Sequence, residues 1–98
     1  MKYILKDKKP VPCKDLLAWA DAFENSENQV AFDRIEDIQI STVFLGVDHA
    51  HGQDGPPMLF ETMVYGGELD KQTERCSTWD EAEVMHKNML QRVQDSLS

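Results

Sequence analysis

The residues best suited to chemistry lie in one short loop between two apolar stretches. Residues 48–57 end in Gly-Pro-Pro and contain two carboxylates and two imidazoles, from Asp48, His49, His51 and Asp54. Zinc and other borderline divalent metals accept these side chains as ligands. The spacing matches neither His-Glu-x-x-His nor the calcium loop Asp-x-Asp-x-Asp-Gly. We therefore expect a hairpin connection that holds no metal, with Asp48 forming a turn, and keep these four residues as a candidate binding site.

A charged residue on the next predicted strand could extend that site. Glu61 lies inside an otherwise apolar stretch, and a buried carboxylate needs a partner, which could come from Arg34, Arg75, His49 or His86. A perturbed carboxylate beside a histidine is typical of general acid–base sites. Strands also commonly place a glutamate on a solvent-facing side. We favour this structural interpretation and retain Glu61 and Arg75 as candidate binding residues.

Other reactive side chains have structural explanations. His86 falls on the apolar stripe of a predicted helix, where a single histidine is usually a hydrogen-bonded core residue. Ser41, Cys76 and Ser77 belong to no nucleophile elbow and have no paired-histidine signature. No glycine loop is followed by Lys-Ser/Thr, so no phosphate loop is predicted. The sequence therefore names no catalytic residue, no metal and no cofactor, and an enzyme is the less favoured class.

Length and charge narrow the functional classes. The 98 residues fit one α+β domain, residues 1–98, and no apolar run is long enough to cross a bilayer. Residues 1–14 carry five lysines against one aspartate, a net charge of +4, so the other 84 residues carry −12. This distribution argues against nucleic-acid binding, which needs clustered basic residues. We expect a cytoplasmic protein, with no membrane association and with Cys13 and Cys76 as free thiols.

The acidic residues are densest between residues 21 and 37. Six carboxylates face the single Arg34 there, giving a charge of −5: Asp21, Glu24, Glu27, Asp33, Glu36 and Asp37. Such a cluster could capture a basic protein partner. The alternative is a solvated surface that only aids solubility.

The hydrophobic pattern predicts a chain of alternating strands and helices. A short strand at Tyr3–Leu5 is followed by prolines that should end it. Residues 13–25 form an amphipathic helix with Leu16, Trp19, Ala20 and Phe23 on its apolar side. A strand near 30–35 precedes a long antiparallel hairpin, 38–47 with 58–66, and residues 72–77 form a further strand. A last helix is capped by Ser77 or Thr78 and runs to about residue 95.

These elements predict an α+β, two-layer sandwich with an antiparallel sheet of four or five strands and both helices on one face. The apolar positions of strand 38–47 change parity, which indicates either a bulge near Ser41–Thr42 or burial of both faces. One shared core should bury the large side chains, namely Trp19, Phe23, Phe44, Phe60, Trp79 and Met89.

Five sequence blocks occur in an order that resembles a known family. They are STVFLG (41–46), Asp48-His49, GPP (55–57), LFETM (59–63) and STWDEAEVMH (77–86). Together they are similar to a family of small proteins of tailed phages and prophages whose function is unassigned. The chain departs from the family pattern in two places. Residues 50–54 stand where the family commonly has a glycine-rich run with a phenylalanine, and Cys76 stands where it commonly has an aromatic residue. The resemblance implies a phage-encoded accessory protein.

Two functional hypotheses follow. The first is a phage accessory protein that binds a host or phage protein, with inhibition of a host system as one form of this activity. The second is a small-ligand or nucleotide-binding protein, or a metal-dependent enzyme, whose site lies near the 48–57 loop and Glu61. Convergence of Asp48, His49 and Glu61 on one concave site would favour the second hypothesis.

Overall fold

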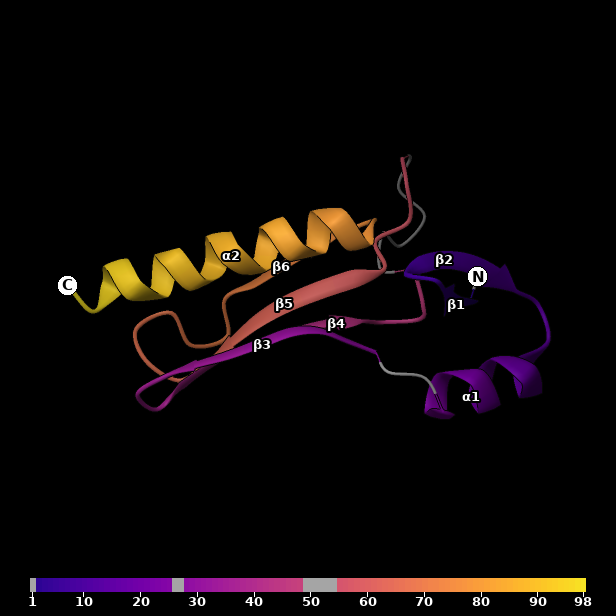
Figure 1. Ribbon diagram of the computed structural model, residues 1–98, viewed down its shortest axis with the longest axis horizontal. Helices are drawn as coiled ribbons and strands as arrows, with labels where there is room; N and C mark the ends of the chain where they lie inside the picture. Colours follow the sequence, from indigo (N-terminus) through magenta and orange to yellow (C-terminus); the bar gives the residue numbers. More distant parts are fainter. Residues whose placement is uncertain (1, 26–27, 49–54) are drawn as a thin grey trace.

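The computed structural model describes residues 2–25, 28–48 and 55–98 and has the predicted α+β fold. Its elements are β1 (Lys2–Lys6), β2 (Lys9–Cys13), α1 (Leu16–Asn25), β3 (Gln29–Ile35), β4 (Ile38–Phe44), β5 (Phe60–Tyr65), β6 (Thr73–Cys76) and α2 (Trp79–Ser96). Strands β3-β4-β5-β6 form an antiparallel sheet in this order, and β1 pairs with β2 in a second sheet. The molecule is elongated, and its two ends lie far apart (Figure 1).

The central β4–β5 hairpin is confirmed, and its pairing is regular from Gln39 opposite Tyr65 to Phe44 opposite Phe60. Strand β4 itself has no bulge at Ser41–Thr42, because Thr42 occupies an inward position and the alternation of buried residues continues through it. The irregularity lies instead in β3, between Gln29 and Ala31. A polar residue at an inward position therefore produced the apparent change of parity in the sequence.

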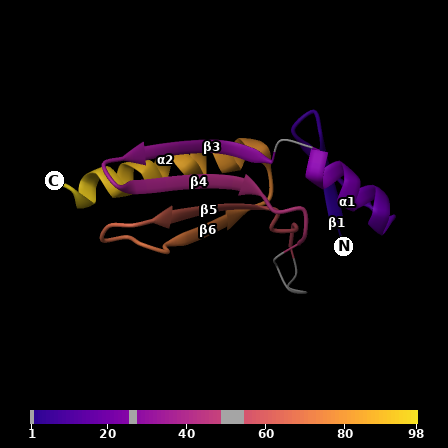
Figure 2. The ribbon, with the colours of Figure 1, turned by 90° about the horizontal axis from the view of Figure 1, so that it is seen from below.

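Helix α2 covers one face of the four-stranded sheet (Figure 1). It begins with the predicted capping box: the Thr78 hydroxyl accepts from the Glu81 N–H at 3.1 Å, and the Glu81 carboxylate accepts from the Thr78 N–H at 3.1 Å. The helix buries one stripe of side chains, namely Ala82, Met85, His86, Met89 and Val93. The opposite face of the sheet has no described element over it (Figure 2).

Helix α1 does not join α2 on the sheet, which corrects the prediction of two helices on one face. It packs on β1 and β2, beyond one end of the larger sheet (Figure 2). The chain reverses at Asp7 and Lys8, whose φ angles of 51° and 69° form a two-residue hairpin turn. The prolines expected to end the first strand lie within the returning strand β2. Helix α1 therefore packs on the β1–β2 hairpin and not on the four-stranded sheet. We call residues 2–25 the N-terminal unit.

The core forms two clusters rather than the single one expected. One contains Ile38, Ile40, Val64, Met89 and Val93. The other contains Phe44, Leu59, Phe60, Ala82 and Met85, with Phe23 and Trp79 packed against it. Trp19, Phe23 and Trp79 are half-buried rather than buried. The prediction that Met89 shares a core with the aromatic residues is therefore wrong, because polar side chains separate the two clusters.

Candidate functional site

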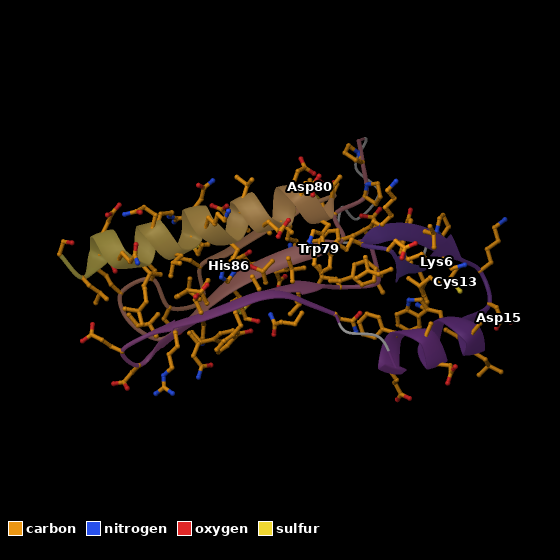
Figure 3. The ribbon with its side chains drawn as sticks, in the orientation of Figure 1. Lys6, Cys13, Asp15, Trp79, Asp80 and His86 are labelled. Atoms are coloured by element: carbon orange, nitrogen blue, oxygen red, sulfur yellow. The ribbon has the colours of Figure 1, made fainter. Side chains whose placement is uncertain are left out.

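Those polar side chains form a hydrogen-bonded row between α2 and the sheet. Thr42 of β4 and Thr62 of β5 contact each other through their hydroxyls, and Thr42 Oγ1 lies 2.7 Å from His86 Nδ1. On the other side of the ring, His86 Nε2 lies 2.7 Å from Asp33 Oδ2 of β3. Figure 3 places His86 between α2 and the sheet. We call Asp33, His86, Thr42 and Thr62 the polar row.

The order carboxylate, imidazole, hydroxyl also occurs in nucleophilic catalytic triads. With Nε2–H donating to Asp33, the Nδ1 atom of a neutral His86 accepts from the Thr42 hydroxyl. Thr42 and Thr62 are both 0% exposed, so neither hydroxyl can reach a substrate. The row therefore satisfies buried polar groups, and the prediction that His86 is a hydrogen-bonded core residue is confirmed. The sequence reasoning missed that Thr42 occupies an inward position of β4, opposite the inward-facing Thr62 of β5.

The 48–57 loop is described only at its two ends. Asp48 Oδ1 accepts a hydrogen bond of 2.9 Å from the Met58 N–H, which ties the start of the loop to its end. His49, His51 and Asp54 lie outside the described residues, so their role in binding stays a prediction. Within residues 2–25, 28–48 and 55–98, no group of three histidine, cysteine or acidic side chains is placed to hold a metal ion.

Glu61 pairs with Arg75, one of the four partners considered from the sequence. The two residues face each other across β5 and β6, and Arg75 Nε donates to Glu61 Oε2 at 3.0 Å. Both lie on the side of the sheet opposite α2, whereas His86 lies on the α2 side. Glu61 and His86 therefore cannot act as an acid–base pair.

The described residues of the predicted acidic patch are spread along the molecule. Asp21 and Glu24 lie on α1, at the end opposite the β3–β4 turn that contains Glu36 and Asp37 (Figure 1). Asp33 accepts from His86, and Glu27 lies outside the described residues. In the turn, Arg34 Nη2 lies 3.9 Å from Asp37 Oδ1. The described members of this set form no single continuous surface, because β3 separates them.

The uncovered side of the sheet, which we call the open face, presents apolar and charged side chains from all four strands. Strand register places on it Phe32, Arg34, Gln39, Ser41, Val43, Glu61, Met63, Tyr65, Thr73 and Arg75. Phe32 is 50% exposed and Tyr65 48% exposed, while Val43 and Met63 are half-buried. Aromatic residues, methionine and arginine are enriched in protein–protein interfaces. The open face therefore has the composition of a binding surface.

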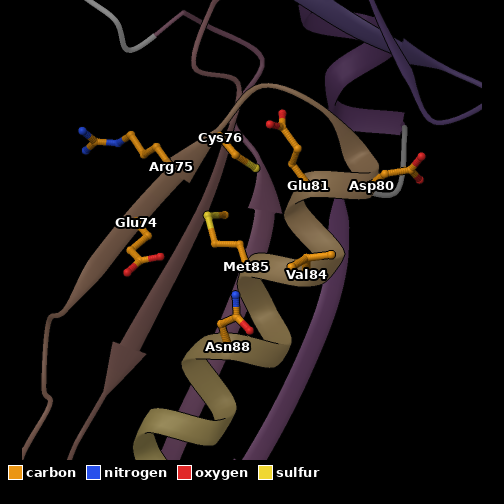
Figure 4. A pocket seen from close by; sticks show the side chains of 8 residues that line it. All are labelled: Glu74, Arg75, Cys76, Asp80, Glu81, Val84, Met85 and Asn88. Atoms are coloured by element: carbon orange, nitrogen blue, oxygen red, sulfur yellow. The ribbon is translucent and has the colours of Figure 1, made fainter.

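A groove of about 470 Å³ lies between β6 and the first half of α2 (Figure 4). We call it the β6 groove; its lining includes Glu74, Cys76, Glu81, Val84, Met85 and Asn88. Burial, and secondly the charge of Glu81, raise the pKa of the Cys76 thiol from 9.0 to about 11. Cys76 is therefore a neutral thiol at physiological pH and unsuited to nucleophilic attack.

Comparison of the chain with protein-family models, with curated proteins and with solved structures finds no match. Of the helices in the described residues, neither is long and apolar enough to cross a membrane. We therefore infer a function from the arrangement of the described side chains.

Proposed function

We propose that this protein is a phage accessory protein that acts by binding a host or phage protein through the open face of its sheet. Inhibition of a host system is one form that such binding takes. The observation that carries the proposal is the exposure of Phe32 and Tyr65, at 50% and 48%, on a sheet face that no described element covers. The resemblance of the five sequence blocks to phage proteins supports the phage origin.

The chemistry of the described side chains favours a protein partner over a small ligand. Glu61 and Arg75 neutralise each other, and the hydroxyls of the polar row are buried. Neither group is available to hold a small polar ligand. The open face instead offers apolar area across β3, β4 and β5, with an ion pair between β5 and β6 that could fix the orientation of a partner.

The proposal is tested by comparing two variants in capture from host and phage-infected lysates. The double variant Phe32→Ser/Tyr65→Ser removes both exposed aromatic side chains. Leu17→Ser is the control, because Leu17 is 81% exposed on α1, away from the open face. A captured protein is then purified and titrated by calorimetry. We expect the double variant to weaken binding at least about tenfold, because aromatic anchors contribute most of the binding energy, and the control to bind normally.

Two results would overturn the proposal. One is that no protein is captured in stoichiometric amount from either lysate. The other is that the double variant binds the captured protein as tightly as the unmodified chain does.

A further inference from the structure

We propose that the free edge of β6 and the β6 groove bind an extended, basic segment of the partner, which adds to the sheet as a further strand. This inference rests on the proposed function and names the chemistry of one part of the partner. Strand addition of this kind joins the main chains by hydrogen bonds, while pockets beside the edge select side chains.

The backbone of β6 leaves hydrogen-bonding groups directed away from the sheet. The carbonyls of Gln72 and Cys76 accept from the N–H groups of Val64 and Leu59, at 3.1 and 2.9 Å. Because alternate residues of a strand direct their backbone groups to the same side, those of Thr73 and Arg75 point outward. An added strand would find two N–H donors and two carbonyl acceptors there.

The other edges of the described sheets are less suited to accept a strand. Pro10 and Pro12 lie in β2, where they remove N–H groups from its edge. In the edge strand β3, the register shifts between Gln29 and Ala31. Prolines and bulges are devices that protect an edge from pairing. Strand β6 has no proline and pairs with β5 in continuous register, so its edge carries neither of these protective features.

The β6 groove would receive alternate side chains of the added strand. Glu74 and Cys76 face α2, since they pair with Thr62 and Phe60, whose side chains are buried on that side. Figure 4 shows Cys76 and Met85 pointing toward each other across the groove, and Val84, one residue before Met85, also lines it. Residues two apart in a strand point to the same side. One apolar side chain of the segment would therefore contact Cys76, Met85 and Val84.

The charges of the groove favour a basic residue beside that apolar one. Arg75 is neutralised by Glu61 on the open face, and Glu74 pairs with Arg92 at 2.8 Å. The remaining charged residues of the groove lining are Asp80 and Glu81, in the first turn of α2. Lys8 and Lys9 lie on the other side of Asp80, outside the lining. A lysine or arginine two residues from the apolar position would complement Asp80 and Glu81. A second copy of this chain would bring the same acidic residues to its own edge and is disfavoured.

The experiment uses a synthetic peptide of about eight residues, the length of a typical strand. Threonine alternates with valine and lysine, so that one side of the extended peptide carries valine and lysine in turn. Binding is followed by fluorescence anisotropy and by amide spectra of the full-length, isotope-labelled protein. We expect the Thr73 and Arg75 amides to shift and to exchange with solvent at least about tenfold more slowly, because only strand addition gives both of them acceptors.

Four controls test the edge and the charge separately. A peptide N-methylated at its pairing amides should not bind, and glutamate in place of lysine should weaken binding at least about fivefold. The double variant Asp80→Asn/Glu81→Gln should weaken binding of the lysine peptide similarly, and Gln at position 81 keeps the capping interaction. Glu83→Gln is the matched control, because Glu83 is exposed on α2 but does not line the groove; this variant should bind normally.

The groove proposal is overturned if the Thr73 and Arg75 amides do not respond, or if the charge changes have no effect. It is also overturned if these amides are already protected in a concentration-dependent dimer, which would make the occupant a second copy. If the lysine peptide does not bind but a captured protein still binds the open face, the groove proposal alone is overturned. Binding of the lysine peptide without any captured protein would overturn the proposed function alone.

Discussion

At the scale of single residues, the hydrogen bonds of the polar row decide whether the buried polar atoms of the core are paired. His86 is 3% exposed and the two threonines 0%, so each polar atom depends on its neighbour in the row. A satisfied buried hydrogen bond contributes only about 1 kcal/mol, but a buried group left without its partner costs about 1–3 kcal/mol. The row therefore specifies one register of α2 against β4 and β5, because any shift would leave polar atoms unpaired.

Replacing Thr42 with valine should lower the free energy of unfolding by about 1–3 kcal/mol. The change removes the hydroxyl that lies 2.7 Å from His86 Nδ1 and that contacts the Thr62 hydroxyl. Urea unfolding measures the loss. Thr73→Val is the control, because Thr73 lies on the open face and donates only to the Lys71 carbonyl; its effect should stay within about 0.5 kcal/mol. Equal losses for the two variants would contradict the structural role of the row.

The Cys76 thiol should be slow to alkylate. A pKa raised from 9.0 to about 11 reduces the thiolate fraction at about pH 8 roughly a hundredfold. In a Cys13→Ser variant, the rate with iodoacetamide should rise about tenfold for each pH unit until the pKa is reached. Adding Glu81→Gln should speed the reaction, since the charge of Glu81 is one cause of the raised pKa. A folded-state rate equal to that in concentrated urea would contradict this account of the groove.

Some site residues were predictable because their contacts are local or follow a pattern. The core position of His86 is of this kind, whereas Asp48 accepts from the Met58 N–H, ten positions along the chain, and the local turn expected at Asp48 stays a prediction. The pairing of Glu61 with Arg75, rather than with three other candidates, depends on strand order and register. The contact of Asp33 with His86 joins residues 53 positions apart. Such pairings cannot be read from spacing along the chain.

At the scale of elements, the caps and hydrophobic periods identified α1, α2, β4 and β5 because these signals are local. The placement of α1 was missed because it depends on the tight turn at Asp7 and Lys8. Two-residue turns with positive φ at both positions usually contain glycine or asparagine, and this one contains neither. The β1–β2 hairpin was therefore hidden in the sequence, together with the surface that α1 covers.

Gly46 joins the N-terminal unit to the sheet, and its replacement by alanine should be destabilising. Its φ is +75°, and an added Cβ would lie 2.6 Å from Phe23 Cε2. Its carbonyl accepts from the Tyr3 N–H at 2.8 Å and from Trp19 Nε1 at 3.2 Å. Backbone strain costs about 1–2 kcal/mol, and displacement of Phe23 should raise the total loss above that and shift Trp19 fluorescence to the red.

Gly55→Ala is the matched control for this prediction. Gly55 also has a positive φ, +115°, but an added Cβ there would meet nothing within 4 Å. The control should therefore show a cost of backbone strain without a change in Trp19 fluorescence. If both variants lose the same stability with no change in either spectrum, the contact of Gly46 with Phe23 does not hold α1 in place.

At the scale of the whole molecule, the fold is a sheet covered by α2 with a smaller unit attached to one end. The sequence predicted the α+β class, because strand-like and helix-like stretches alternate clearly along it. The division of the core into two clusters was not predicted, because Thr42 was not recognised as inward-facing and its contacts with Thr62 and His86 were therefore not expected. The N-terminal unit adds to the second cluster mainly through Phe23, whose ring centre lies 6.2 Å from that of Phe44.

This attachment predicts that the N-terminal unit opens before the rest of the molecule unfolds. No described side chain of residues 2–25 is fully buried, and Leu16 and Leu17 are 60% and 81% exposed. Helices with little buried area exchange their amides through local opening, whereas core strands exchange only on global unfolding. In native-state hydrogen exchange, we expect the amide of Trp19 to exchange at least about tenfold faster than that of Val64, and its rate to depend less on added urea. Equal protection and equal urea dependence would show that α1, the hairpin and the sheet unfold as one cooperative unit, and that the contacts at Gly46 and Phe44 are strong enough to couple them.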